Sequence, residues 1–486
     1  MRHGISFVLL AALAAPTVVA RDEPAMRHSE VVFMYTADSE VYEAYEATFM
    51  AWSGAPTEDE VERHHDLDMR CAASIWFLTA GARLLHEDPV LHEAVVKDFD
   101  GNPIEVPWLF DHRHEEQETW FGCTNNPDYQ AHLREQVRNA MSGGADSLHI
   151  DDHLGTAQTV DHMGGCFCGH CMAGFREFLE EEVDAEKLEE AGIESLEDFD
   201  YHEFARGYAD NVDEYIAVQW DIPLMDEFIK FNRQAAAALT GKMREVGAEA
   251  AGHPVLLSAN AWIGQERHRT VLPYLTHVVC ENPHHAAAGT DNLDGAIGFY
   301  EFGEDYGIPV AATAGGHDWA HAAAEERYAL VQVWVALAYA HGQRFMVPHR
   351  QWCYTEELGT HWHTFPEDVY APMYRFIRAN AEWFDGFLAA EADLETPDTV
   401  LATLRTQDGK AVIHLLNLDY DSEADELRPR EDVRVTIPAD AIPETESVEL
   451  LRYDGETNTL DITFEDGAAS FTVPELTVWT LAVFGE

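Results

Sequence analysis

Between residues 30 and 385 the chain alternates short apolar runs with longer stretches whose apolar residues recur at helical spacing. Short apolar runs bounded by polar residues are typical of buried strands. The predicted strands are 31–35, 69–78, 104–110, 145–150, 255–258, 277–280, 308–313 and 344–347. The helices predicted among them are 41–66, 128–141, 171–182, 223–246, 291–306, 322–340 and 366–383. About eight such strand and helix units favour a closed (β/α)8 TIM barrel, with an open doubly wound sheet as the alternative.

The pattern changes after residue 386, where apolar and polar residues alternate in short runs separated by Gly, Asp, Asn and Pro. The strands predicted there are 400–404, 411–416, 433–437, 448–453, 461–464, 469–473 and 478–484. They predict a small antiparallel β-sandwich over 387–486, after a barrel domain over 21–386. The sandwich carries no cluster of reactive residues, so we interpret it as a structural or carbohydrate-associated module. An acidic helical insert around 180–222 is interpreted as a solvated surface.

Residues 1–20 have the pattern of a secretory signal peptide. Arg2 supplies a basic start, residues 5–15 are apolar, and residues 18–20 are small or short, as at a cleavage site. We expect the mature chain to begin near Arg21 and the protein to be secreted or periplasmic. No later apolar run has the length of a membrane span, so no membrane partner is expected.

The charge is strongly negative, with 89 acidic residues against 30 basic ones and a formal net charge of -59. A surface of this kind keeps a protein hydrated at high ionic strength, where salt screens the self-repulsion, so a halophilic source is expected. The chain has no basic stripe that could neutralise phosphates, so nucleic acid is not expected as a partner. The oligomeric state stays open, a homo-oligomer included.

Polar residues follow most of the predicted strands, where a barrel places its catalytic groups. Candidates at these strand ends are His149, Asp151, Asp152, His153, Asn260, Trp262, Glu281, His317, Asp318, Arg350 and Trp352, and the loop before Cys123 adds His112 and Arg113. Along the fourth predicted strand, the alternation of side chains directs Leu148 and Ile150 toward the helices and Asp151 into the barrel.

Asp151 and Glu281 are the predicted catalytic pair, facing each other across the barrel mouth. Cleavage of a glycosidic bond needs one carboxylate to attack or to activate water, and another to protonate the leaving oxygen. Asp152 and Asp318 are alternates for these roles. Asp152 could instead cap a loop, and Glu281 could instead hold a substrate hydroxyl or a neighbouring arginine. The histidine, asparagine, arginine and tryptophan candidates are expected to bind the sugar.

Three of the seven cysteines, Cys166, Cys168 and Cys171, lie within six residues, and Cys123 stands just before the preceding predicted helix. Four thiolates form a closed tetrahedral set, which suits structural Zn2+ and leaves no position for substrate. A disulfide with free thiols is the alternative.

Several of these segments resemble the family-42 glycoside hydrolases. The likeness is carried by 121–129, by 149–155 and by the cysteine motif that leads into Phe175, and it continues more faintly at 258–260 and 279–283. The resemblance implies a β-galactosidase-type barrel whose cysteines bind zinc. It also implies two catalytic glutamates that this chain lacks, because Asp152-His153 replaces Asn-Glu after the fourth strand and 312–316 has no Glu. The scaffold and the zinc therefore carry over, while β-galactosidase activity does not.

His149-x-Asp151 together with Glu281 is similar to a second layout, that of α-glycosidase and dextranase-type barrels. That layout implies a nucleophilic Asp after the fourth strand and an acid/base carboxylate after the sixth. We therefore expect a glycoside hydrolase that acts on a poly- or oligosaccharide, and Arg113 and Arg350 raise the hypothesis of an anionic glycan. Two alternatives stay open: a non-catalytic glycan-binding protein, and a metal-dependent hydrolase or lyase that uses the histidines around Asp151.

Overall fold

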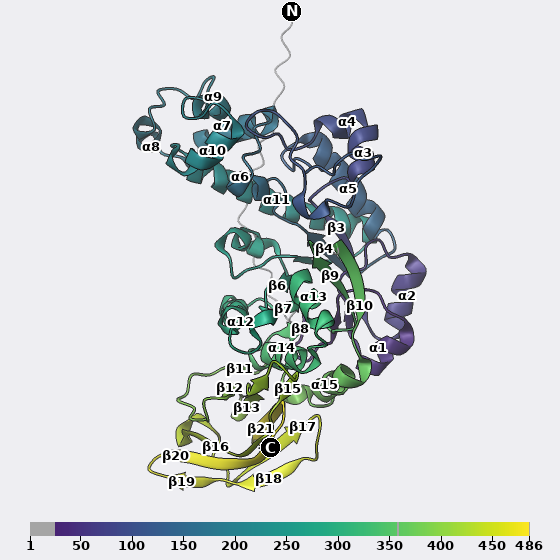
Figure 1. The fold of residues 1–486 in the computed structure, drawn as a ribbon, viewed down its shortest axis with the longest axis vertical. Helices are drawn as coiled ribbons and strands as arrows, with labels where there is room; N and C mark the ends of the chain where they lie inside the picture. Colours follow the sequence, from purple (N-terminus) through teal and green to yellow (C-terminus); the bar gives the residue numbers. More distant parts are fainter. Residues whose placement is uncertain (1–24, 357–358, 486) are drawn as a thin grey trace, which may run out of the picture.

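The computed structural model describes residues 25–356 and 359–485 of the chain (Figure 1). The predicted signal peptide, residues 1–20, lies outside the described residues. None of the helices in the described ranges is both long enough and apolar enough to cross a membrane.

Short parallel strands form a closed barrel. In the described residues they are β1 (Val32–Phe33), β2 (Phe49–Met50), β3 (Arg70–Trp76), β4 (Ser147–Asp151), β5 (Leu256–Ala259), β6 (Val278–Asn282), β7 (Val310–Ala314) and β8 (Arg344–Phe345). β1 to β5 pair in sequence order, and so do β6 to β8. The Thr276 N–H donates to the Leu257 carbonyl at 2.9 Å, and the Val347 N–H donates to the Val32 carbonyl at 2.8 Å. These two contacts join the sheets, so the predicted barrel is confirmed over the open sheet.

Helices surround the barrel, and their ends follow local sequence signals. They are α1 (Ser39–Tyr45), α2 (Glu58–Asp66), α3 (Ala82–Glu87), α4 (Pro89–Glu93), α5 (Pro127–Met141), α6 (Ala157–His162), α7 (Gly169–Glu182), α11 (Met225–Ala251), α12 (Asp294–Tyr306), α13 (Gly316–Ala324), α14 (Tyr328–Ala340) and α15 (Glu367–Ala379). Thr57 and Glu60 form a capping box that starts α2. Asn126 caps α5, and Pro127 occupies its first turn, where a missing N–H costs nothing.

Several sequence-based assignments are wrong. The predicted helix 322–340 is divided between α13 and α14, which are separated by residues 325–327. The predicted helix 41–66 is two helices separated by β2, because the apolar Phe49–Met50 pairs with β1 and β3 instead of continuing a helix. The predicted strand 104–110 contains an isolated bridge and the 3-10 turn η1 (Pro107–Leu109), where proline cannot donate to a ladder. A hairpin of β9 (Arg350–Thr355) and β10 (Gly359–Thr364) also follows β8 and was not predicted.

Side chains of the barrel strands alternate between two cores. Leu148 and Ile150 point outward and pack in the main hydrophobic core with residues of the surrounding helices. A second set points inward and fills the barrel: Val32, Phe49, Ala72, Val279, Ala311 and Met346. On β4 and β6 the inward direction therefore belongs to Asp151 and Glu281, which stand above this filled interior.

The acidic insert forms a small helical layer beside the cysteine segment, at the end of the molecule opposite the sandwich (Figure 1). It contains α8 (Ala185–Glu190), α9 (Tyr201–Ala205) and α10 (Val212–Val218). Its aromatic residues pack with the cysteines in a core separate from that of the barrel helices; Tyr215 stacks on Phe99, with ring centroids 4.7 Å apart. The insert thus lengthens the connection between β4 and β5 and packs against Phe99 in the connection between β3 and β4.

The C-terminal part is a β-sandwich, as predicted. Its strands are β11 (Leu388–Ala389), β12 (Val400–Gln407), β13 (Lys410–Asn417), β14 (Tyr420–Asp421), β15 (Glu426–Leu427), β16 (Arg430–Pro438), β17 (Ser447–Arg452), β18 (Asn458–Asp461), β19 (Thr463–Glu465), β20 (Ala468–Leu476) and β21 (Trp479–Phe484). One sheet has the order β11-β12-β13-β21-β17-β18 and faces a second, β16-β20-β19, across a shared apolar core. Buried Arg405 on β12 binds both carboxylate oxygens of Glu304 on α12, at 2.8 and 2.9 Å, which anchors the sandwich to the barrel.

Candidate functional site

Asp151 and Glu281 meet at the barrel mouth through one asparagine. Asn260, just after β5, donates its side-chain N–H to Asp151 Oδ1 at 2.9 Å and to Glu281 Oε2 at 3.4 Å. Its own Oδ1 accepts the backbone N–H of Glu281 at 3.1 Å, which fixes the direction of the amide. The structure therefore brings three of the predicted site residues together on β4, β5 and β6.

The shared nitrogen limits the distance between the two carboxylates. Because the nitrogen lies 2.9 Å from Asp151 Oδ1 and 3.4 Å from Glu281 Oε2, these two oxygens are at most about 6.3 Å apart. Retaining glycosidases hold their carboxyl groups roughly 5–5.5 Å apart, whereas inverting enzymes need roughly 6.5–9.5 Å to admit a water molecule. The spacing fits the first class better.

Burial raises the pKa of both carboxyl groups. It raises the pKa of Asp151 to about 6, against the lowering effect of the hydrogen bonds from Asn260 and from the Asp152 N–H. The pKa of Glu281 rises to about 7, through burial and the nearby Asp151 charge. The Asp151 carboxylate accepts two hydrogen bonds and the Glu281 carboxylate accepts one, so hydrogen bonding favours the ionised form of Asp151 more, in the direction that a nucleophile and a general acid require.

Asp152 is a third carboxyl group at the same mouth. Its backbone is left-handed, with φ 47°, and its N–H donates to Asp151 Oδ1 at 2.8 Å. Burial, Asp151 and Glu281 together raise the pKa of Asp152 well above its usual range. Its main-chain N–H thus positions Asp151, and the surroundings of its side chain favour the protonated form.

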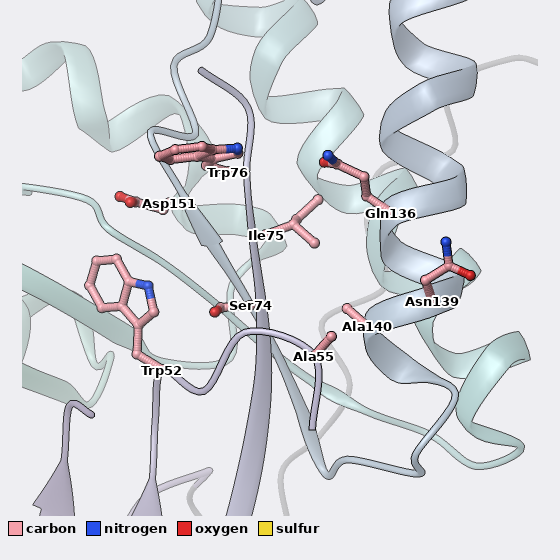
Figure 2. Close-up of a pocket in the computed structure, with 9 residues that line it drawn as sticks. All are labelled: Trp52, Ala55, Ser74, Ile75, Trp76, Gln136, Asn139, Ala140 and Asp151. Carbon is pink, nitrogen blue, oxygen red and sulfur yellow. The ribbon is translucent and has the colours of Figure 1, made fainter. Parts of the chain in front are cut away.

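Two tryptophans flank Asp151 in a pocket of about 390 Å³. Figure 2 shows the Trp52 and Trp76 rings on either side of the Asp151 side chain, with Ser74 below. Tyr35, after β1, lies near both carboxylates, whose charges add to burial in raising the pKa of its hydroxyl. An acid between indole faces can receive a sugar ring, because the apolar faces of pyranoses stack on aromatic rings.

These three aromatic residues were missed by the sequence prediction. Each follows one of the first three barrel strands: Tyr35 after β1, Trp52 after β2 and Trp76 at the end of β3. The signal was present in the apolar run 49–52, bounded by Thr48 and Ser53. It was hidden because the helical spacing around it predicted one long helix.

His149, two residues before Asp151, lies fully buried inside the barrel. Its ring lies 4.1 Å from that of Trp52, and its Nδ1 is 3.0 Å from Ser258 Oγ. Burial lowers the pKa of His149 to about 3, so the ring is neutral at physiological pH. It supports Trp52 from below and is not an open sugar contact.

Three other predicted residues are engaged away from the carboxylate pair. Asp318 accepts the backbone N–H groups of His284 and Ala286, each at 2.8 Å, so both of its oxygens hold the loop after β6. His153 is buried, with its Nε2 3.0 Å from His268 Nδ1. Trp262 packs against the main hydrophobic core.

The predicted arginines are occupied. Arg113 binds Glu105 at 3.0 Å and Glu118 at 3.8 Å, and it also donates to backbone carbonyls of its own loop. The guanidinium of Arg350 lies 4.5 Å from the Trp362 ring centroid. Neither lines the pocket that holds Asp151, whereas Arg113 lines the adjoining pocket that shares Trp76 with it.

The remaining predicted sugar contacts lie at the rim. His112 pairs with Asp111 at 2.7 Å, and His112 lines a second pocket that shares Trp76 with the first. On the hairpin, Trp352 stacks on Tyr354 at 5.8 Å, and His317 contacts the same tyrosine ring at 4.6 Å. The hairpin therefore forms an aromatic edge on one side of the barrel mouth.

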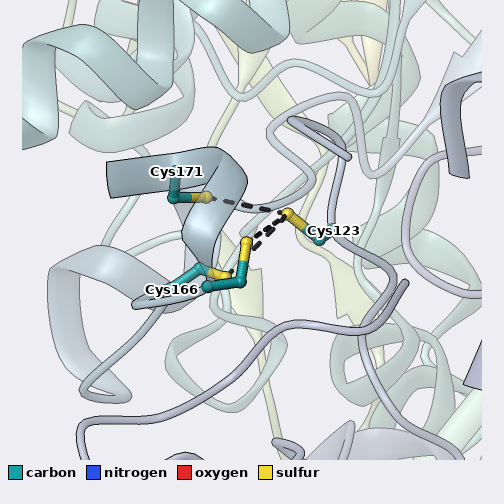
Figure 3. A group of neighbouring side chains, drawn as sticks. Cys123, Cys166 and Cys171 are labelled. Atoms are coloured by element: carbon teal, nitrogen blue, oxygen red, sulfur yellow. Dashed lines mark hydrogen bonds between the residues drawn. The ribbon is translucent and has the colours of Figure 1, made fainter. Parts of the chain in front are cut away.

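The four predicted cysteines form one cluster. The sulfur of Cys123 lies 3.6 Å from those of Cys168 and Cys171 and 3.9 Å from that of Cys166 (Figure 3). A disulfide requires about 2.05 Å, and these cysteines are free. Four sulfurs at about 2.3 Å from one zinc ion would be about 3.8 Å apart, so the spacing fits a tetrahedral site.

Neighbouring N–H groups donate hydrogen bonds to two of these sulfurs. Asn125 donates its side-chain N–H to Cys171 at 3.3 Å, and the Lys97 backbone N–H donates to Cys166 at 3.4 Å. Such bonds orient and stabilise metal-bound thiolates. In the described residues, this cluster is the one group of His, Cys, Asp or Glu side chains close enough to hold a metal ion.

Comparison with known proteins gives distant relatives. The chain is 23% identical over 324 residues to an alpha-agarase of Alteromonas agarilytica, and 22% identical over 321 residues to an alpha-agarase of Thalassotalea agarivorans. Each match covers 60% of this chain but only 21% and 20% of the relative, so the chain spans about one fifth of their length. No family model matches.

Solved structures show the same fold at low identity. A Paenibacillus cycloisomaltooligosaccharide glucanotransferase superposes with a TM-score of 0.58 and 9% identity, covering 94% of this chain and 85% of that one. A β-galactosidase of Bacillus circulans sp. alkalophilus gives 0.53 and 10%, covering 94% and 99%. The comparisons support a glycoside hydrolase-like chain, but not family 42 in particular. The fold shared with these structures is a (β/α)8 barrel followed by a β-sandwich.

Proposed function

We propose that this protein is a glycoside hydrolase in which Asp151 is the nucleophile and Glu281 is the general acid and base. The observation that carries the proposal is the Asn260 bridge, which holds two carboxyl groups of unequal pKa within one sugar's reach. Both stand at the mouth of the barrel, where the catalytic groups of this fold are found.

The geometry supports a two-step reaction with retention. An Asp151 oxygen attacks the anomeric carbon, the bond to the leaving oxygen breaks, and the Glu281 proton moves to that oxygen. Glu281, now ionised, takes a proton from water; the water oxygen bonds to the anomeric carbon and releases Asp151. Trp52 and Trp76 would hold the sugar ring against the carboxylates during both steps.

The substrate we propose is an α-linked galactan of the agar type. The curated relatives are alpha-agarases, and the lining of the Asp151 pocket carries aromatic and amide groups with no cationic partner for sulfate or uronate. Secretion would suit such a substrate, because a polysaccharide is too large to enter the cell, and residues 1–20 have the pattern of a signal peptide.

The test compares wild type, Asp151→Asn and Glu281→Gln on agarose, on a starch-type α-glucan and on a sulfated galactan, with release of reducing ends as the measurement. We expect activity on agarose and a loss of at least about 1000-fold in both variants. Glu266→Gln, an exposed carboxylate in the loop after β5, is the matched control and should retain full activity.

Two further results would separate the roles. Azide added to Asp151→Ala should restore turnover and give a glycosyl azide of inverted configuration, because a small anion replaces the missing nucleophile. NMR of the first product formed by wild type should show the anomer of the substrate. Full activity in Asp151→Asn, or inversion in the wild type, would overturn the assignment.

We also propose that Cys123, Cys166, Cys168 and Cys171 hold a structural zinc ion. The support is the sulfur spacing and the N–H donors to two of the sulfurs. Four protein ligands leave no open coordination position, so the zinc ion would cross-link the loop after β3 to the loop after β4 and take no part in catalysis. Metal analysis should give one zinc per chain, lost in Cys168→Ser but retained in Cys353→Ser, whose cysteine lies outside the cluster.

A further inference from the structure

The pocket beside Asp151 does not end at the barrel mouth. On its inner side it is lined by Trp52, Trp76 and Asp151, and it continues past β3 to Gln136 and Asn139 on α5. Figure 2 shows the two groups on opposite sides of β3, with Ala55 where the loop after β2 crosses the strand. We call this outer part the β3 slot.

The slot exists because β2 is short. β2 pairs with β3 over Phe49–Met50, and the Ser74 N–H still donates to the Gly54 carbonyl at 2.7 Å. The chain then turns outward to α2, and the Pro56 carbonyl packs so closely on Gly143 that a Cβ there would lie 2.2 Å from it. The loop is thereby held down and away from the end of β3, which leaves space above Ala55.

The slot combines amide groups with apolar surface. Gln136 and Asn139 are three residues apart on α5 and share one face of the helix. The Gln136 Oε1 atom is buried and accepts no hydrogen bond from the described residues. Ile75 and Ala140 add apolar surface beside it. An unpaired amide oxygen next to apolar surface suits a sugar, which offers hydroxyl donors and a C–H face.

The charge of the residues that line the pocket favours an uncharged ligand over an anionic one. Among the residues that line this pocket, Asp151 at the inner end is the one ionisable group. A sulfated or uronic unit in the slot would face no cation, and the protein's own charge would repel it. The whole pocket, with the part beside Asp151 included, has a volume of about 390 Å³, within the range of sites that bury a small ligand.

We propose that the β3 slot is an outer subsite for an uncharged sugar unit of the substrate chain. This unit neighbours the one at Asp151 on the side away from the cleaved bond, so a disaccharide that is being cleaved does not reach the slot. Gln136 and Asn139 would hydrogen-bond the hydroxyls of this outer unit, so the substrate would leave the barrel sideways over β3 instead of along the barrel axis. This inference rests on the proposed function, because it places the rest of the substrate relative to the proposed nucleophile.

The experiment measures kcat and KM for a neutral agarose-derived disaccharide and hexasaccharide in wild type, Gln136→Ala, Asn139→Ala and Ala55→Trp. We expect KM for the hexasaccharide to rise about 5- to 10-fold in each amide variant, with kcat and the disaccharide values unchanged. Ala55→Trp should obstruct the slot and abolish the advantage of the longer substrate. Glu135→Ala, an exposed neighbour on α5, is the control and should behave as wild type.

Binding separates this inference from the proposed function. Calorimetry of the hexasaccharide with Asp151→Asn reports on the slot without turnover, and adding Gln136→Ala to that background should weaken binding about 5- to 10-fold. Equal losses for short and long substrates, or unchanged hexasaccharide binding in the double variant, would overturn the slot. Retained activity in Asp151→Asn would instead overturn the catalytic assignment.

Discussion

The cysteine cluster and the carboxylate cluster both draw on the segment that begins at the end of β4, but they are built in opposite ways. Four like groups converge at nearly equal distances in the first, where every sulfur can be satisfied by one ion. In the second, Asp151 and Glu281 are joined by a single amide and differ in pKa. The first arrangement is closed and the second is open to the pocket.

This difference suggests that the cysteine cluster serves the stability of the fold and the carboxylate cluster serves the reaction. A closed metal site contributes its binding free energy to folding, because the unfolded chain does not present the four ligands together. Burying carboxyl groups with raised pKa values has the reverse effect, since the folded state must hold charges that water would stabilise better. Changes in the first cluster should therefore act mainly on folding, and changes in the second mainly on turnover.

The largest effect on folding is expected from the cysteine cluster. Cys168→Ser should lower the free energy of unfolding by about 4 kcal/mol, because zinc would lose one of four ligands and the two loops their cross-link. Urea unfolding followed by circular dichroism measures this. Cys353→Ser should cost far less, and an equal loss in both variants would show that the cluster is ordinary packing.

Asn260 should dominate the carboxylate cluster. Asn260→Ala removes the donor that favours ionisation of both acids, so both pKa values should rise, kcat should fall about 10-fold and the acidic limb of the pH profile should move upward. Asn260→Asp has nearly the same shape but adds a negative charge between two carboxylates. We expect a fall of about 100-fold in kcat, or about 2.7 kcal/mol.

The expected order, with Asn260→Asp less active than Asn260→Ala, tests whether Asn260 positions the carboxylates or binds substrate. If Asn260 only held a sugar hydroxyl, as the sequence suggested, both variants would raise KM and leave the pH profile in place. An aspartate variant more active than the alanine variant would also contradict electrostatic control of the pair by Asn260.

The carboxylate cluster should destabilise the fold at alkaline pH. The folded protein keeps protons on Asp151 to about pH 6 and on Glu281 to about pH 7, whereas the unfolded chain releases them near pH 4. Between these limits the folded state binds more protons, so the free energy of unfolding falls as pH rises. Asp151→Asn removes this penalty.

We therefore expect Asp151→Asn to be more stable than wild type by about 1–2 kcal/mol at pH 8, allowing for solvent screening of partly exposed side chains, and equal to it near pH 4. Thermal unfolding across this pH range measures the difference. Glu266→Gln, with an exposed carboxylate, should follow wild type throughout. A variant less stable than wild type at pH 8 would mean that Asp151 stabilises the fold.

Much of the fold was predictable because barrel strands are short and apolar and their helices are amphipathic. The sequence pattern identified β3 to β7 to within a few residues and all of the longer sandwich strands. It failed where local and tertiary preferences compete. Phe49–Met50 is a two-residue strand stabilised only by its neighbours in the closed sheet, and the β9–β10 hairpin is packed against α13.

The two clusters also differed in how far their residues could be predicted from the sequence. The cysteines were visible because three of them are close in sequence, and a thiolate set has one common use. Asp151 and Glu281 were found by the rule that catalytic groups follow barrel strands, and Asn260 was found by the same rule but given a different role. Trp52 could not be placed while β2 was hidden inside a predicted helix, and Trp76 was missed because the predicted strand 69–78 ran two residues beyond it.

Substitution of Asp318 should have the smallest effect on stability and turnover, and it tests whether Asp318 belongs to the carboxylate cluster. It was an alternate catalytic acid in the sequence, but its two oxygens accept the N–H groups of His284 and Ala286. Asp318→Asn keeps one acceptor oxygen and loses the other, so we expect about 1 kcal/mol less stability and less than a threefold change in kcat. A 1000-fold loss of kcat with normal stability would move the general acid from Glu281 to Asp318. In that case the Asn260 bridge would position only the nucleophile, and the catalytic pair would span β4 and β7 in place of β4 and β6.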